Sequence, residues 1–317
     1  MWEAVEFALA VTLPNALLLI FGWLLQRSGQ IDGHFAHQAA KLVFHYGLPM
    51  LLFVQLSRGE IYYAEQLDLL AAGVVTTLVL FVLAEGYAWK YVSDVRDKGV
   101  FVQGVFRSNM GIAGLALVQN AYGDAGVAAG AVYLGVITVL YNVLAVITLS
   151  RSTNTGEAWG KRVGQLFKNV VQNPLIVAIV AALLLQQWEW KVPALMLQTG
   201  AYVAQIAIPL ALICSGATFD MRSLWNTSDI SLHASVGRLV LAPLVAVAVG
   251  WGFGFSGVAM GVLFLMTATP ATASGYIMAK AMGANDVAAA NIVGITTFVG
   301  MVSAALGIAG LRGMGWM

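Results

Sequence analysis

Charged residues are scarce in this sequence. Lys, Arg, Asp and Glu together make up 10% of its 317 residues, whereas hydrophobic residues make up 60%. A soluble domain needs far more charge on its surface, so this composition excludes one. The 16 Lys and Arg and 15 Asp and Glu form no basic tract, and we therefore expect no nucleic-acid partner.

Cysteine and catalytic motifs are nearly absent as well. The single Cys214 excludes an internal disulfide and does not report the compartment. No Cys or carboxylate completes a credible metal site with His34 and His37, so we expect no metal and no other cofactor. The apolar segments contain no paired aspartates, no serine elbow and no His-Asp pair, so we do not expect a membrane-embedded protease or acyltransferase.

What the sequence has instead is a series of apolar runs, each about twenty residues long, the length that crosses a bilayer as a helix. The flank of the first run is acidic and lacks a basic region, so we expect a retained helix rather than a cleaved signal. We predict ten spans, at residues 5–25, 37–56, 67–89, 100–119, 126–149, 164–186, 193–217, 232–253, 258–280 and 287–311.

The two halves of the chain resemble each other in the placement of proline. An offset of 160 positions places Pro174 on Pro14 and Pro209 on Pro49; a chance match is the alternative. Residues 1–155 and 156–317 then contribute five spans each, and an odd number makes the second half enter the membrane from the opposite side. The sequence therefore predicts an all-α integral membrane protein of two inverted five-helix repeats.

Lys and Arg are divided unevenly between the two sets of connections, and the richer side is expected to be cytoplasmic. The richer set holds Arg27, Lys90, Arg96, Lys98, Arg151, Lys161, Arg162, Lys168, Arg222 and Lys280, and the poorer set holds Arg58, Lys191 and Arg312. Both termini fall on the poorer side, so we expect both outside the cytoplasm.

The ninth predicted span is interrupted. Residues 267–280 (TATPATASGYIMAK) contain three threonines, a serine, Pro270 and Gly275, and each freed backbone group costs several kcal/mol in hydrocarbon unless something bonds it. On the same offset this stretch overlies residues 107–120, which are also broken by glycines and carry an asparagine. Paired interruptions of this kind indicate the binding site of a transporter. We expect the breaks near residues 115–116 and at Gly275.

Each second half-helix would begin near the bilayer midplane with free N–H groups and a positive dipole end, which bind carboxylates and other anions. The first half-helices would end there with carbonyls that could hold a cation, so the dipoles alone leave the sign of the ligand open. The scarcity of buried carboxylates favours an organic anion. The polar side chains nearest the breaks, which could orient a ligand or only cap helix ends, are Ser108, Asn109, Thr269, Thr272 and Ser274.

Three ionisable residues have two interpretations each. Glu85 lies inside the third span and could carry a coupled proton, or it could pair locally near the helix end, five residues before Lys90. Arg107 and Arg238 could attract an anion or anchor their helices at the interface.

Several short motifs follow one another along the chain. They are GLPMLLF at 47–53, SN at 108–109 with GL at 114–115, NAYG at 120–123, NP at 173–174, IPLALICSG at 208–216, RLVLAP at 238–243, TP at 269–270, YIMA at 276–279 and Gly283. In this order and spacing they resemble the auxin efflux carrier family. The resemblance implies ten helices in two inverted repeats with the fourth and ninth spans crossed and broken, as in bile acid symporters and Na⁺/H⁺ antiporters.

The resemblance also implies a scaffold unit from spans 1, 2, 6 and 7 and a transport unit from spans 3–5 and 8–10, which moves as an elevator. Members carry organic anions, auxin in plants and small carboxylates such as malate, malonate or lactate in bacteria, across the plasma or bacterial inner membrane, and a homodimer is expected by analogy. Plant members commonly have proline at both crossover points, where this sequence has Ala116 and Gly275.

We therefore predict a secondary transporter, active or facilitated, of a small organic anion. The predicted substrate-binding residues are Ser108, Asn109, Gly114, Ala116, Thr269, Pro270, Ser274 and Gly275, and the predicted scaffold residues opposite them are Pro49, Pro209 and Gly216. The coupling ion is left open between H⁺, with Glu85 as its carrier, and Na⁺. The alternatives are a sodium-coupled symporter of the bile-acid type, a proton-coupled antiporter and an anion sensor that does not transport.

Overall fold

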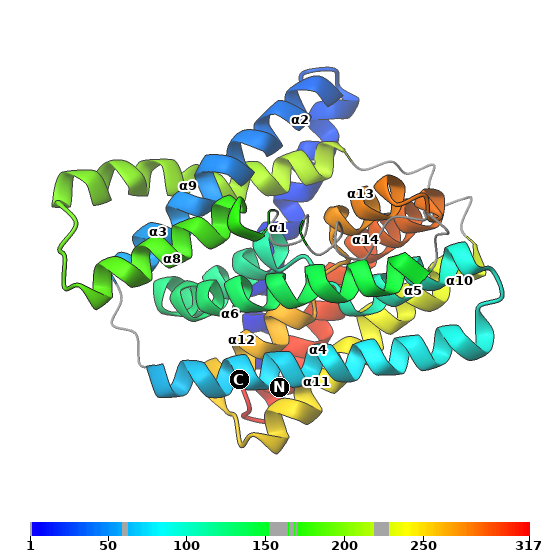
Figure 1. Ribbon diagram of the computed structural model, residues 1–317. Helices are drawn as coiled ribbons and strands as arrows, with labels where there is room; N and C mark the ends of the chain where they lie inside the picture. The colour runs from blue at the N-terminus through cyan, green and yellow to red at the C-terminus, as the bar shows by residue number, and fades with distance from the viewer. Residues whose placement is uncertain (1, 59–62, 152–163, 165–167, 169, 219–227) are drawn as a thin grey trace.

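The computed structural model describes residues 2–58, 63–151, 164, 168, 170–218 and 228–317, and regular structure within them is helical (Figure 1). The start of the predicted sixth span and the boundary between residues 155 and 156 lie mostly outside the described residues. In chain order the elements are α1 (Trp2–Arg27), α2 (Gly33–Leu42), η1 (Val43–Gly47), α3 (Leu48–Arg58), α4 (Tyr63–Tyr91), α5 (Val95–Phe106), η2 (Met110–Gly114), α6 (Leu115–Arg151), α8 (Pro174–Gln187), α9 (Ala194–Ala217), α10 (Asp229–Val236), η4 (Gly237–Leu241), α11 (Ala242–Gly252), α12 (Gly257–Thr267), α13 (Ala273–Ala281) and α14 (Asp286–Gly313).

Seven helical segments of the described chain are long and apolar enough to cross a membrane. They are Trp2–Arg27, Gly33–Arg58, Gln66–Tyr91, Met110–Ser150, Ala194–Ala217, Asp229–Gly252 and Asp286–Gly313, and the shorter helices Pro174–Gln187 and Gly257–Thr267 are apolar as well. Six of the predicted spans coincide with six of these segments. The predicted fourth and ninth spans are each divided between two helices.

Polar side chains begin several of the helices. Asp94 accepts a hydrogen bond from the backbone N–H of Arg96 at the start of α5, and Asn173 accepts one from Leu175 at the start of α8. Pro174 follows Asn173 at the first position of α8, where a missing N–H costs nothing. These caps satisfy donors that a helix start otherwise leaves free.

Two prolines within the helical segments follow a wide turn. The π-helical turn η1 directly precedes Leu48 and Pro49, and the π-helical turn η4 directly precedes Ala242 and Pro243. Because proline has no N–H and its ring clashes with the preceding turn, a widened turn lets the segment continue past it. The segment from α2 to α3 and the segment from α10 to α11 can each therefore cross as one unit.

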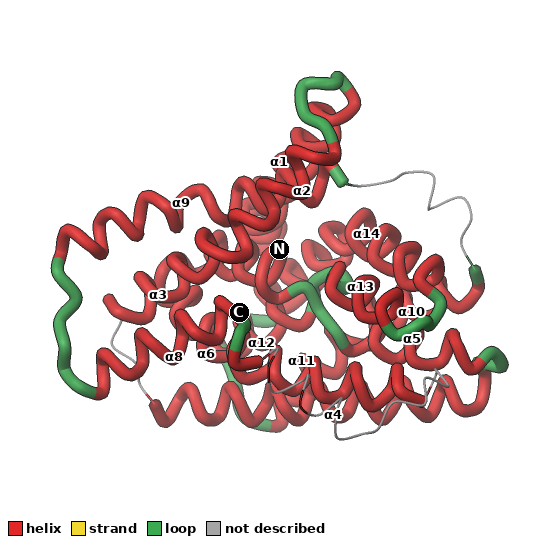
Figure 2. The backbone as a smooth tube through the Cα atoms, turned by 45° about the horizontal axis from the view of Figure 1, so that its top comes forward, coloured by secondary structure: helices red, strands yellow, loops and turns green. Residues whose placement is uncertain are grey.

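Helices α3, α8 and α9 lie side by side (Figures 1 and 2). We call α1, α2, α3, α8 and α9 the first group and α4, α5, α6 and α10 to α14 the second group. Helix α1 packs against both, on α9 in the first group and on α14 and α6 in the second. Within the first group α1 and α9 cross so closely that a Cβ at Gly22 would lie 2.0 Å from the Ile213 oxygen, and a Cβ at Gly216 would lie 2.0 Å from the Leu19 oxygen. Helices in membranes approach each other in this way through small residues.

Candidate functional site

Two helices of the second group are interrupted, and their interruptions lie against each other. The chain leaves the helix after Phe106 and re-enters it at Met110, and it leaves again after Thr267 and re-enters at Ala273. Ser108 and Ala271 form an antiparallel bridge between the two extended stretches. The prediction that both predicted spans are broken is confirmed.

The predicted positions of the breaks were wrong. Ala116 lies in α6 and is fully buried, and Gly275 lies in α13, where its carbonyl accepts a hydrogen bond of 2.9 Å from the Gln103 side chain. Glycine weakens a helix but does not end it. The second break instead surrounds Pro270, which has no N–H and disfavours helical geometry at Thr269.

Backbone hydrogen bonds between the two interruptions replace those that the helices lose. The Asn109 N–H donates to the Pro270 oxygen at 2.8 Å, and the Thr272 N–H donates to the Arg107 oxygen at 3.4 Å. The Ala271 N–H donates to the Thr296 hydroxyl oxygen of α14 at 3.0 Å. An irregular backbone inside a membrane requires such partners, so the two breaks stabilise each other.

A cavity of about 390 Å³ lies at this crossing, within the range of about 300–1,000 Å³ that is usual for small-molecule sites. The N-terminal ends of both second half-helices border it, through Asn109, Ile112 and Ala113 at η2 and through Ala273 and Tyr276 at α13. The other residues that line it are Leu19, Leu212, Ser215, Thr218, Pro270, Ala271, Ala290, Val293, Gly294, Thr297 and Met301.

The described residues of this lining include no charged side chain. Polarity comes from hydroxyls and one amide, together with the starts of η2 and α13, which carry a positive dipole end. At the start of α13, the Ser274 and Gly275 N–H groups already donate to the hydroxyl and carbonyl oxygens of Thr272. Lys280 lies beside the lining, with its Nζ atom 3.4 Å from the Tyr276 hydroxyl. The described lining of the cavity is therefore polar but uncharged.

Comparison with known protein families matches residues 12–308 to the membrane transport protein family. The chain belongs to this family, the auxin efflux carriers. It is similar to the uncharacterized transporter YfdV of Escherichia coli K12, 24% identical over 285 residues that cover 86% of this chain and 88% of that protein. It is also similar to an uncharacterized transporter of Methanothermobacter thermautotrophicus, 21% identical over 272 residues that cover 83% and 85% of the two chains. This auxin efflux carrier homologue is thus a membrane transporter and not an enzyme.

Of the predicted substrate-binding residues, Asn109 and Pro270 line the cavity at the crossing, which we call the larger cavity. Gly275 lines a second, much smaller cavity together with Thr272. The other predicted substrate-binding residues line neither cavity and lie in or beside the crossing helices: Ser108, Gly114, Ala116, Thr269 and Ser274.

Two of these residues have structural contacts that the sequence did not reveal. The Ser108 hydroxyl donates to the Met266 oxygen at 2.9 Å and lies 3.0 Å from the Tyr141 hydroxyl. Ser274 is paired with Thr272, whose hydroxyl lies 3.1 Å from its own. Both side chains therefore hold the broken ends of the carrier's helices in place.

Sequence reasoning did not select four polar residues of the cavity, which are Ser215, Thr218, Tyr276 and Thr297. Tyr276 lies inside the interrupted stretch, and Ser215 lies inside the IPLALICSG motif, so the sequence marked the segment around each of these two residues. Thr297 lies on α14, where two adjacent threonines give no local sign of which one faces a ligand.

The three predicted scaffold residues of the carrier do not face the larger cavity. Pro49 and Pro209 are absent from its lining, and Pro209 is exposed on α9. Gly216 lies at the crossing with α1 and borders an adjoining apolar groove of about 350 Å³ between α1, α9 and α14. Glu85 lies on α4, outside the lining of either cavity at the crossing.

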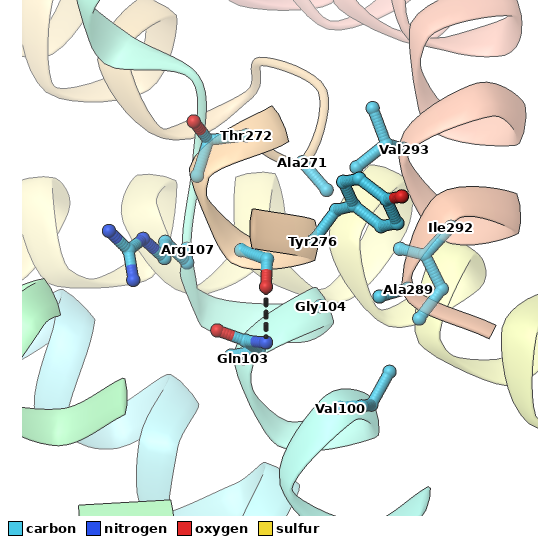
Figure 3. A pocket seen from close by; sticks show the side chains of 11 residues that line it. Val100, Gln103, Gly104, Arg107, Ala271, Thr272, Tyr276, Ala289, Ile292 and Val293 are labelled. Carbon is cyan, nitrogen blue, oxygen red and sulfur yellow. Dashed lines mark hydrogen bonds between the residues drawn. The ribbon is translucent and has the colours of Figure 1, made fainter. Parts of the chain in front are cut away.

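Figure 3 shows the smaller cavity, which occupies about 10 Å³ between α5, α13 and α14. This volume suits about one water molecule and not a carboxylate. The Gln103 Oε1 atom beside it is buried and has no hydrogen-bond partner. The Arg107 guanidinium points away from the Tyr276 ring and donates to the Asn142 side chain at 2.8 Å.

Proposed function

We propose that this protein is a secondary transporter, active or facilitated, of a small organic anion, a mono- or dicarboxylate or an auxin-like acid. The observation that carries the proposal is the cavity bordered by the N-terminal ends of η2 and α13. Each such end contributes about 0.3–1 kcal/mol toward binding an anion, and up to about 2 kcal/mol when partly buried. Two ends that border one cavity act together on the same carboxylate.

The position of the cavity supports alternating access of the elevator type. Leu19 of α1 and Ser215 of α9 border it from the first helix group, whereas the crossing and α14 border it from the second. In the proposal the first group is the scaffold, formed by spans 1, 2, 6 and 7, and the second is the transport unit. Sliding of the transport unit would carry the anion with the crossing that binds it.

Ten crossings in two inverted repeats, residues 1–155 and 156–317, are part of the same proposal. The start of α1 and the end of α14 lie close together, with the Arg312 guanidinium carbon 4.7 Å from the centroid of the Phe7 ring. A chain whose first and last spans have their outer ends on one side crosses an even number of times. The distribution of Lys and Arg then favours both termini outside the cytoplasm, and similarity to the family favours a plasma or bacterial inner membrane.

The proposal is tested by uptake of labelled malate, malonate, lactate and indole-3-acetate into proteoliposomes under imposed pH, sodium and voltage gradients. Asn109→Ala removes a cavity amide while the backbone pairing with Pro270 remains, and we expect saturable flux of one anion to fall. Thr199→Val is the control, because Thr199 is exposed on α9 and bonds only within its own helix.

Other outcomes of the same experiment separate the alternatives. Flux driven by sodium would favour a symporter of the bile-acid type, and flux that loses its pH dependence in Glu85→Gln would favour proton coupling. Binding of an anion without flux would replace the carrier by a sensor. Equal flux in wild type and Asn109→Ala would contradict the placement of the site in this cavity.

A further inference from the structure

The opposite ends of the broken helices converge on one arginine. Arg238 lies in the π-helical turn η4 and is fully buried. Its Nη1 atom donates to the Val105 oxygen at 2.8 Å, and its Nη2 atom donates to the Thr267 oxygen. Val105 is in the last turn of α5 and Thr267 is the last residue of α12, so one guanidinium joins the C-terminal ends of both first half-helices.

These carbonyls form the negative side of the crossing. Helix C-termini carry a partial negative charge on carbonyls without an intrahelical partner, and broken half-helices in transporters use such ends to coordinate Na⁺ or H⁺. A guanidinium is a cation with several donors in a fixed planar fork, and it stays charged when buried. Arg238 therefore supplies from the chain itself the positive charge that this position attracts.

The charge of Arg238 is not matched by an acidic side chain within the described part of the chain. The groups around it are the two carbonyls and the tyrosine hydroxyls of Tyr133 and Tyr141, and its Nε atom is buried without a hydrogen-bond partner. Carbonyl dipoles stabilise the guanidinium but leave its net charge in place. Thr267 is only three residues before Pro270, which lines the larger cavity, so an anion there is attracted by this charge in a medium of low dielectric.

We propose that Arg238 is a built-in cation that occupies the position of a coupling metal ion, so that the carrier needs no sodium or other alkali cation to bind or move its anion. Arg238 is a positioning residue in this proposal, because it acts through the half-helix ends and its charge and not by contact with the substrate. The part that concerns transport rests on the proposed function. If Arg238 served only to join two helices, a neutral side chain of similar shape could replace it.

The first test uses wild-type protein in proteoliposomes, with sodium, potassium or choline as the only added cation on both sides. We expect uptake of the transported carboxylate to be the same in all three, and apparent unfolding temperature in detergent to be unaffected by exchanging choline for sodium. Uptake that requires sodium, or specific stabilisation of the wild type by sodium, would overturn the proposal.

The second test uses Arg238→Ala with added guanidinium ion, and with urea as a neutral molecule of nearly the same shape. We expect the substitution to reduce anion uptake on the order of a hundredfold, since a paired buried group is removed. Guanidinium should restore part of this loss, and Arg238→Lys should retain more uptake than Arg238→Gln. Arg96→Gln is the control, because Arg96 also donates to a carbonyl, that of Ala284, but is exposed.

A stability measurement keeps the two proposals separable. A ligand that binds only the folded state raises its apparent stability, so millimolar guanidinium should raise the unfolding temperature of Arg238→Ala relative to the same concentration of urea. If no carboxylate is transported in any cation, the proposed function fails, and this difference still decides the role of Arg238. Equal effects of guanidinium and urea, or equal uptake by the Lys and Gln variants, would overturn the built-in cation. Should Arg238→Ala not fold, the Lys and Gln variants and the wild-type cation exchange decide the question.

Discussion

Thr296 and Thr297 are adjacent on α14 but should respond oppositely to the same substitution. Thr296 is fully buried, and its hydroxyl oxygen accepts the Ala271 N–H at 3.0 Å while it donates to the Ile292 oxygen at 2.7 Å. Thr297 is half-buried and lines the cavity. Thr296→Val keeps the shape of the side chain but leaves the Ala271 N–H without a partner in a buried site. An unsatisfied buried donor costs about 1–3 kcal/mol, and we expect the free energy of unfolding to fall by that amount.

Thr297→Val should leave the free energy of unfolding within about 0.5 kcal/mol of wild type, as substitutions outside packed and bonded sites usually do. If the Thr297 hydroxyl donates to the bound anion, its loss costs about 1.5–3 kcal/mol of binding, or roughly a 10- to 150-fold rise in Kd. Unfolding is followed by tryptophan fluorescence in detergent micelles, and binding by equilibrium dialysis of the labelled anion. A Thr296→Val variant as stable as Thr297→Val would refute the inference that α14 holds the crossing through this hydroxyl.

Three further substitutions test the packing around the site. Gly216→Ala should lower the unfolding temperature, because its Cβ would lie 2.0 Å from the Leu19 oxygen and α1 and α9 would have to separate; overpacking of this kind costs about 1–3 kcal/mol. Gly123→Ala should cost about 1–3 kcal/mol in chemical unfolding for a conformational reason alone, because Gly123 has φ 60 and ψ −148 with open space where its Cβ would be. Ser108→Ala should reduce anion uptake and lower stability by about 1 kcal/mol, since it removes the bond to the Met266 oxygen; unchanged uptake would show that the crossing tolerates its loss.

The helical spans could be predicted because each depends on its own composition. Runs of apolar residues at 5–25, 67–89 and 287–311 fall within the helices α1, α4 and α14, since length and hydropathy alone decide whether a segment can cross a bilayer. The sequence also indicated that two spans would be broken. Both signals are local, so one sequence was sufficient.

The positions of the breaks could not be read locally. Residues 107–109 contain neither proline nor glycine, and they leave the helix because the stretch around Pro270 offers backbone partners across the fold. That pairing joins residues that are far apart in the sequence, and it competes with helix formation only once both helices are in place. Glycine was the visible weak point in each stretch, yet Gly114 and Gly275 serve for close packing and for a carbonyl contact with Gln103.

In the sequence, the half-helix dipoles alone left the sign of the ligand open, and the scarcity of buried carboxylates favoured an anion. A broken helix offers a positive end and a negative end together, so the break alone could attract either an anion or a cation. The fold separates these ends: the N-terminal ends of η2 and α13 border an uncharged cavity, and the C-terminal carbonyls at Val105 and Thr267 are bonded to Arg238. Because the carbonyls already have a cation, the ends that stay open to a ligand are the positive ones. The sequence left Arg238 between attracting an anion and anchoring its helix, and in our proposal it is the residue that decides which charge the crossing can accept.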